Sequence, residues 1–275
     1  MTTYALPLHQ TDTPSINSPI ALREAVATGT VTWLWTLVAA LCRLVLFTVG
    51  IYAVYGYYVA VGHPQAWWMS LNLTNFSLVL TADLGSFLLL RWLLRREGIT
   101  FGQLLNLKVP LWKEIPLGMG LTLLFLVAFY ISNIVSWIVV YGPDVFTNPP
   151  TFDSTNIPQM PMWVLWWGLL VLPLTVGIME EFLYRGYLQP RLIALTRNTW
   201  VGILLTAFFF GVQHLVLPLY DVQTSLSRFV STFLIGLLFG MLYQRQKRLL
   251  PLIIAHWLID VIGLGLLPLM ATMMA

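Results

Sequence analysis

Seven stretches of predominantly apolar residues recur along the chain, and they constrain its fold more than any other feature. A helix that crosses the bilayer needs about 20 such residues. The stretches that qualify run over residues 33–58, 75–94, 115–141, 162–185, 199–217, 226–244 and 250–267. Because lipid cannot satisfy backbone polar groups, these stretches predict an all-α, polytopic transmembrane bundle. A short segment after Pro268 would supply an eighth helix.

The composition supports this fold class and excludes several kinds of function. Hydrophobic residues fill 58% of the 275 positions and charged residues only 9%, against about 25% charged residues in an ordinary soluble domain. The net charge of +3 does not indicate nucleic-acid binding, because the basic residues lie between the apolar stretches rather than in one patch. The single cysteine, Cys42, excludes an intrachain disulfide and a cysteine metal cluster.

The distribution of lysine and arginine predicts which side of the membrane each connection faces. If the N-terminus is cytoplasmic, only Arg228 falls on the opposite side, and the positive-inside rule favours this orientation. We therefore expect a flexible cytoplasmic tail over residues 1–30 and a membrane-embedded domain over 31–275, in the plasma membrane of a prokaryote. The cytoplasmic segments would then hold 12 of the 14 basic residues: Arg23, Arg91, Arg95, Arg96, Lys108, Lys113, Arg185, Arg191, Arg197, Arg245, Lys247 and Arg248.

Charged side chains inside the spans need an explanation, because each costs about 2.5–3.5 kcal/mol at the bilayer centre even by the lower estimates. Arg43 and Asp83 fall in the first two spans, both at about 12–15 Å depth for the helical rise per residue. We expect these two side chains to form a structural ion pair, separate from the other charged groups.

The fourth span carries the sequence Glu-Glu-Phe-Leu-Tyr-Arg, which starts at Glu180. Neighbouring residues on a helix point about 100° apart, so Glu180 and Glu181 cannot share one role. Glu181 and Arg185 have the i,i+4 spacing and the order that favour an ion pair. Glu180 is then left without a partner in this motif, and such a buried carboxyl group is suited to proton exchange. The alternative is that the motif is only a structural pair of Glu181 and Arg185. That alternative explains Glu181 but leaves Glu180 unpaired.

Two histidines lie in later spans, and each has a motif neighbour four residues away. Phe210 precedes His214, and Asp260 follows His256, so each pair shares a helical face. A carboxyl group beside an imidazole orients the ring and fixes its tautomer. Either histidine alone could be a structural polar group, but together with Glu180 they predict one site.

The three motifs resemble those of the CPBP family, which comprises the CAAX prenyl endopeptidases and bacteriocin-processing proteins and is also called the ABI family. That family carries Glu-Glu-x-x-x-Arg, Phe-x-x-x-His and His-x-x-x-Asn/Asp motifs, which match residues 180–185, 210–214 and 256–260 here. The resemblance covers a catalytic core of about residues 160–265. In CAAX endopeptidases the last position is asparagine, so Asp260 departs from that subgroup, and the resemblance specifies the family rather than a prenylated substrate.

The resemblance implies an intramembrane endopeptidase that acts on a peptide or a membrane-protein substrate. It implies that Glu180 and His214 activate a water molecule, while His256 and Asp260 bind the oxyanion. Asp260 could instead orient His256, because an aspartate donates a hydrogen bond only when it is protonated. The remaining motif residues would hold these groups in place: Glu181, Arg185 and Phe210.

Zinc is the alternative to a metal-free mechanism. Members of the family are often described as metalloproteases, and Glu180, His214 and His256 would supply three ligands and leave a fourth position for water. The spans contain no His-x-x-x-His pair, and a glutamate can activate water without a metal. We therefore expect that no cofactor is required.

The predicted depths of the three side chains do not agree with a single site. With these span boundaries Glu180 and His256 lie about 8–10 Å from one membrane surface, whereas His214 lies about 22 Å from it. Because a catalytic site requires the side chains to converge, either a boundary is misplaced or the fifth helix starts deep or tilts strongly.

Two other function classes fit part of the pattern. A catalytically silent scaffold, as proposed for relatives in bacteriocin immunity, would not need intact motifs. A proton-coupled transporter would use buried carboxyl and imidazole groups as a relay, but the sequence shows no inverted repeat with paired broken helices. The sequence leaves the substrate, the cleavage site and the oligomeric state open.

Overall fold

The computed structural model describes residues 17–107, 109–147, 161–216 and 221–274, apart from the side chains of residues 75, 271, 272 and 274. These residues form helices and no strand. The α-helices are α1 (Pro19–Ala27), α2 (Trp33–Ala60), α3 (Ala66–Asn72), α4 (Thr74–Leu78), α5 (Leu84–Arg96), α6 (Phe101–Leu105), α7 (Leu111–Tyr141), α8 (Met162–Leu170), α9 (Leu172–Glu180), α10 (Gln189–Thr196), α11 (Thr199–Gln213), α12 (Val222–Gln246), α13 (Leu250–Asp260) and α14 (Leu267–Met274). Three π-helices, η1 (Val79–Asp83), η3 (Glu181–Leu188) and η5 (Val261–Leu266), and two 3₁₀ turns, η2 (Pro143–Phe146) and η4 (His214–Val216), complete the set.

Within these ranges, seven helical runs are long and apolar enough to cross a membrane. This confirms the predicted all-α polytopic bundle, and the protein is a multi-pass integral membrane protein. The runs are Trp33–Ala60, Phe76–Arg96, Leu111–Tyr141, Met162–Thr196, Thr199–Val216, Val222–Gln246 and Leu250–Met270.

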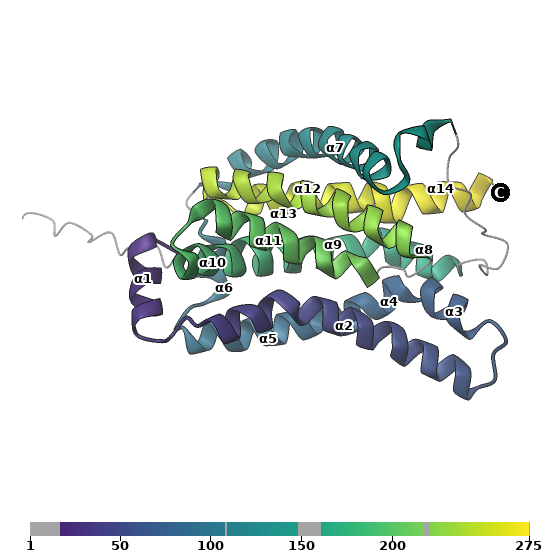
Figure 1. The fold of residues 1–275 in the computed structure, drawn as a ribbon, viewed down its shortest axis with the longest axis horizontal. Helices are drawn as coiled ribbons and strands as arrows, with labels where there is room; N and C mark the ends of the chain where they lie inside the picture. Colours follow the sequence, from purple (N-terminus) through teal and green to yellow (C-terminus); the bar gives the residue numbers. More distant parts are fainter. Residues whose placement is uncertain (1–16, 108, 148–160, 217–220, 275) are drawn as a thin grey trace, which may run out of the picture.

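The spans pack side by side, with α2 and α5 along one side of the bundle and α7 along the other (Figure 1). Helix α11 packs on α12, both α12 and α13 pack on α7, and α9 packs on α13. On the opposite side α2 contacts η1 and α11. The helices that carry the three motifs therefore occupy the middle of the bundle, where side chains can be shielded from lipid.

The fourth span extends beyond its predicted end at Arg185 and continues through η3 and α10 to Thr196. The count of basic residues placed Arg185 and Arg191 in a cytoplasmic connection between spans. Both are fully buried within the fourth span instead. With this longer helix Glu180 lies about 24 Å from Thr196, close to the depth of His214.

The seventh span also starts inside the bundle. Leu249 packs on Gly186, so close that a Cβ on this glycine would lie 2.9 Å from Leu249 Cδ1. Because α13 begins at this level, His256 comes level with the motif of the fourth span. The predicted disagreement in depth therefore came from one misplaced helix end, at Arg185, and from the assumption that the seventh span starts at the membrane surface.

Residues 19–27, expected to belong to a flexible tail, form helix α1. The Ser18 side chain accepts a hydrogen bond from the backbone N–H of Ala21 at 3.2 Å, and Pro19 fits the first turn of a helix. Leu22 is buried, and Asn17 Nδ2 donates to the carbonyl oxygen of Gly186 at 3.1 Å. Any flexible tail is therefore shorter than residues 1–30; residues 1–16 lie outside the described residues.

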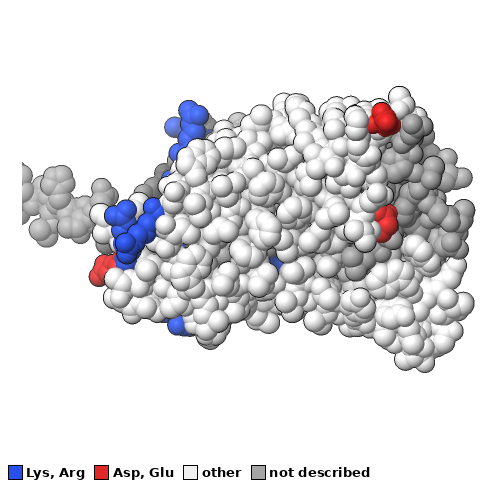
Figure 2. Space-filling view, in the orientation of Figure 1, with Lys and Arg blue, Asp and Glu red and all other residues white. Residues whose placement is uncertain are grey.

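Exposed basic side chains gather at the end of the bundle where α1 lies, here called the basic end (Figure 2). Acidic side chains are visible toward the opposite end of the same view (Figure 2). This asymmetry is the basis of the positive-inside rule, and a cytoplasmic location of the basic end remains a prediction. Lys108 lies outside the described residues. Basic residues that follow or end the helices here include Arg95, Arg96, Arg197, Arg245 and Lys247.

Helices α11 and α12 approach each other closely at Gly236. A Cβ on this residue would lie 3.1 Å from Phe210 Cδ1 and 3.3 Å from the Cα of Ala207. Small residues permit such close packing between membrane helices. This contact holds the Phe210 side chain, and with it the end of α11, against the centre of the bundle.

Replacing Gly236 with valine should therefore force α11 and α12 apart. We expect Gly236→Val to lower stability by about 1–3 kcal/mol, as overpacking usually does, and to lower the thermal midpoint of the purified protein in detergent. Gly120→Val is the matched control, because Gly120 is exposed on α7 and a Cβ there would meet no atom within 4 Å. Equal midpoints for the two variants would contradict this packing.

Candidate active site

Glu180 lies at the end of α9 with 2% of its surface exposed. Its Oε1 accepts hydrogen bonds from Arg43 Nη2 and from Gln213 Nε2, each at 3.0 Å. The expectation of an unpaired carboxyl group does not hold, because the charged partner comes from the first span rather than from the motif. The second oxygen, Oε2, has no hydrogen-bond partner among the described residues and lies 3.7 Å from His256 Nε2.

Arg43 and Asp83 lie in an ion pair, with 2.7 Å between Nη1 and Oδ1. The sequence predicted that this pair would be separate from the motif residues, but the pair contacts them. The guanidinium of Arg43 also donates from Nε to Gln213 Oε1 at 2.8 Å and from Nη2 to Glu180. Arg43 is fully buried, so it joins polar groups from η1, α9 and α11 without contact with water.

His256 is held by Glu181, with 2.8 Å between Nδ1 and Oε1. The same Oε1 accepts from Arg185 Nη1 at 3.0 Å. Because an ionised carboxylate only accepts hydrogen bonds, Nδ1 of His256 is the donor. Asp260, four residues along the same helix, has its Oδ2 at 3.6 Å from His256 Nε2. Sequence spacing indicated this last contact, but it could not show that Glu181 reaches His256 from another helix.

Two aromatic rings enclose the guanidinium of Arg185. Its Cζ lies 4.3 Å from the centroid of Phe210 and 4.8 Å from that of Phe239. Cation–π attraction is strongest for a desolvated cation, and Arg185 is fully buried. The rings thus hold Arg185, which holds Glu181 and, through it, the imidazole of His256. Phe239 was missed in the sequence because α12 carries none of the motifs.

His214 begins the turn η4 at the end of α11, and its Nδ1 lies 2.7 Å from the carbonyl oxygen of Phe210. A carbonyl oxygen only accepts, so Nδ1 carries the proton and Nε2 of the neutral ring is free to accept one. The rings of His214 and Phe210 lie 5.0 Å apart between centroids. The Phe210 ring also lies 6.3 Å from the ring of His256, whose Nε2 is 3.7 Å from Glu180 Oε2, so the three predicted side chains lie in one region of the bundle.

Each of the three π-helices adjoins an acidic residue: Asp83 and Glu180 are buried, and Asp260 is partly buried. The π-helix η1 ends at Asp83, η3 begins directly after Glu180, and η5 begins directly after Asp260. A π-helical turn is wider than an α-helical turn and occurs frequently at functional sites. It changes the angular positions of the following side chains, so the predicted α-helical spacing describes these motifs only approximately.

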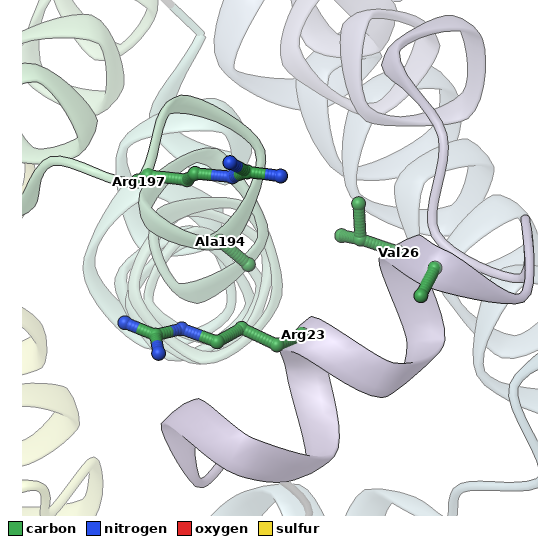
Figure 3. Close-up of a pocket in the computed structure, with 5 residues that line it drawn as sticks. Arg23, Val26, Ala194 and Arg197 are labelled. Carbon is green, nitrogen blue, oxygen red and sulfur yellow. The ribbon is translucent and has the colours of Figure 1, made fainter.

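The cluster is almost closed. The side chains of His256 and Asp260 are 11% and 15% exposed, compared with 2% for Glu180, so the cluster reaches the surface on the side of α13. A separate surface pocket of about 320 Å³ lies between α1 and α10 at the basic end (Figure 3). It lies about 21 Å from Glu180 along the fourth span and is not part of this site. Its lining residues are Arg23, Val26, Ala27, Ala194 and Arg197.

The zinc alternative requires Glu180, His214 and His256 to act as ligands together. In the part of the chain that the structure describes, no three His, Cys, Asp or Glu side chains are arranged to hold a metal ion. The Nδ1 atoms of both histidines are also engaged with protein oxygens. The site as it stands does not fit the metal, so no step below involves zinc, and metal independence remains a prediction.

Comparison with protein families matches residues 161–262 to a family described as type II CAAX prenyl endopeptidase Rce1-like. No curated protein and no solved structure matches the chain. The matched segment contains all three motifs, whereas Arg43 and Asp83 lie outside it. The match of this segment to a CAAX-type protease family confirms the resemblance that its three motifs indicated.

Proposed function

We propose that this protein is an intramembrane endopeptidase in which Glu180 and His214 activate a water molecule. The observation that carries the proposal is the orientation of Glu180. One carboxylate oxygen accepts from Arg43 and Gln213, and the other faces His256 without a hydrogen-bond partner among the described residues. A fixed carboxylate with one free oxygen is suited to accept a proton from water, and base catalysis of this kind contributes about 10²–10⁴-fold.

The water oxygen forms a bond to the carbonyl carbon of the peptide, while its proton passes to Glu180 or His214. The carbonyl oxygen becomes an oxyanion in the tetrahedral intermediate. Collapse of this intermediate breaks the carbon–nitrogen bond, and the stored proton passes to the leaving amine. The products are a carboxylic acid and an amine, which become a carboxylate and an ammonium group when the remaining proton passes between them, and the base is restored.

His256 and Asp260 are proposed to stabilise the oxyanion. Because Nδ1 of His256 donates to Glu181, its Nε2 carries a proton only in the charged ring. With one proton on a carboxyl group as well, the buried cluster is neutral, which avoids the cost of an uncompensated charge. Of the four carboxyl groups in this cluster, that of Asp260 forms no ion pair with an arginine within the described ranges. We therefore assign the proton to Asp260. The cluster comprises Asp83, Glu180, Glu181, Asp260, Arg43, Arg185 and His256.

Glu180→Gln is the central test of this function. Glutamine can still accept the two hydrogen bonds at its oxygen but cannot take a proton, so we expect cleavage to fall at least about 100-fold with an unchanged thermal midpoint. The purified protein is assayed on internally quenched peptides ending in cysteine, two aliphatic residues and a final residue. One peptide is farnesylated and one is not, and an apolar peptide library extends the search.

Glu24→Gln is the matched control, because Glu24 is exposed on α1, and it should cleave like the wild-type protein. Cleavage by Glu180→Gln at the wild-type rate would contradict the assigned base. No cleavage by the wild-type protein would favour a silent scaffold. Proton uptake in liposomes in the absence of cleavage would favour the transporter.

Asp260→Asn separates the two roles considered for Asp260. An asparagine amide donates a hydrogen bond as a protonated aspartate does, so we expect Asp260→Asn to retain at least about a tenth of the wild-type rate. The cleavage rate of Asp260→Leu should be about 100-fold lower than that of the wild-type protein, because removal of one oxyanion donor has an effect of this size in other enzymes. Equal loss in both variants would show that the carboxylate charge is needed, and would favour orientation of His256 instead.

Metal independence is tested by prolonged dialysis of the purified protein against ortho-phenanthroline. We expect cleavage to continue at the wild-type rate, because Glu180 and His214 supply the base without a metal. The control is the same treatment of a known zinc endopeptidase, which should lose activity. Loss of cleavage that added zinc restores would contradict the metal-free mechanism.

A further inference from the structure

We infer that Arg43, together with Gln213, is a positioning residue that fixes the carboxylate of Glu180 for the reaction. Arg43 lies in the first span, outside the segment that matches the family. The inference rests on the proposed function and assigns a part of the machinery to a region in which the sequence shows only apolar spans. The alternative is that Arg43 serves only as a structural counter-ion for Asp83.

The guanidinium of Arg43 is held by contacts on three sides. Its three nitrogens donate in three directions: Nη1 to Asp83 at 2.7 Å, Nε to Gln213 at 2.8 Å and Nη2 to Glu180 at 3.0 Å. An arginine side chain presents these donors in one rigid plane, whereas lysine offers a compact charge. The plane cannot rotate without breaking one of the three contacts, so its direction toward Glu180 is fixed.

The Gln213 amide has a single orientation that satisfies its neighbours. Its oxygen accepts from Arg43 Nε at 2.8 Å and from the Tyr184 hydroxyl at 3.0 Å. Because an arginine can only donate, the amide oxygen must face it, and the amide nitrogen must face the other way. That nitrogen donates to Glu180 Oε1 at 3.0 Å. All three side chains around this amide are buried, so water does not compete for these bonds.

These contacts make the two oxygens of Glu180 unequal. Both donors converge on Oε1, and neither contacts Oε2, which faces His256. Rotation of the carboxylate out of its plane would break both hydrogen bonds, so one oxygen stays directed toward His256. A counter-ion for Asp83 would not require the contacts with Gln213 and Glu180, so charge compensation alone does not explain this arrangement.

The test is a paired variant, Arg43→Gln/Asp83→Asn, which removes one positive and one negative charge together. Arg43→Gln alone would leave Asp83 buried without a counter-charge and could prevent folding. A structural pair predicts that the paired variant folds and cleaves like the wild-type protein. Positioning predicts a thermal midpoint within a few degrees, a KM within about threefold and a kcat at least about 30-fold lower, because small misplacements of catalytic groups cost up to about 10²-fold.

The matched control is Arg248→Gln/Glu114→Gln, which removes another ion pair, with 2.8 Å between its charged atoms, at the start of α7. It should leave kcat unchanged. Arg43→Lys keeps the charge but loses the planar donors, so we expect an intermediate kcat with unchanged folded yield. If the paired variant does not fold, Arg43→Lys decides the question, because a wild-type kcat for it would overturn the inference.

The assay uses the farnesylated and unmodified quenched peptides, and kinetic constants are measured on the one that the wild-type protein cleaves faster. Wild-type kcat in the folded paired variant would overturn the positioning role and leave the proposed function intact. No cleavage of either peptide or of the apolar library by the wild-type protein would overturn the proposed function and the inference together.

Discussion

Burial of carboxyl groups at the centre of a membrane bundle is the physical cost around which this protein is organised. An isolated ionised group in the bilayer is expensive, and breaking a buried ion pair leaves a charge that nothing compensates. Here Arg43 lies between Asp83 and Glu180, and Arg185 lies beside Glu181. The packing of the first span on the fourth depends on these contacts.

The two arginines support different members of the same site. Arg43 acts on Glu180 through a direct contact and through Gln213. Arg185, enclosed by two aromatic rings, acts on His256 through Glu181. Neither arginine contacts both groups, and the two arrangements meet where Glu180 Oε2 faces His256 Nε2. In the proposed mechanism, the general base and the oxyanion donor are therefore oriented independently.

Much of the fold could be predicted because the signals are local. Apolar length fixes the number of spans, and i,i+4 spacing indicates the pair formed by Glu181 and Arg185. The helix ends were harder, because an arginine in a sequence resembles the end of a span. Arg185 and Arg191 are buried instead, beside Glu181 and Glu97, and these partners cannot be recognised from spacing alone.

The contacts between helices could not be predicted in the same way. Nothing in the sequence connects Arg43 to Glu180, because two complete spans lie between them and no periodicity relates them. Gln213 directly precedes His214 and can be recognised in the sequence as a polar residue in an apolar span. Its contacts with Arg43 and Glu180 cannot be recognised there. The π-helices also escape sequence reasoning, since they arise where packing widens a turn.

The most direct measurement is a density map of the protein in lipid nanodiscs, at a resolution that separates the side chains around Glu180. The account predicts that Arg43 and Gln213 both lie within hydrogen-bond distance of one carboxylate oxygen, and that the other oxygen faces the imidazole of His256. A map in which Glu180 turns away from Arg43, or in which His256 points into lipid, would contradict it.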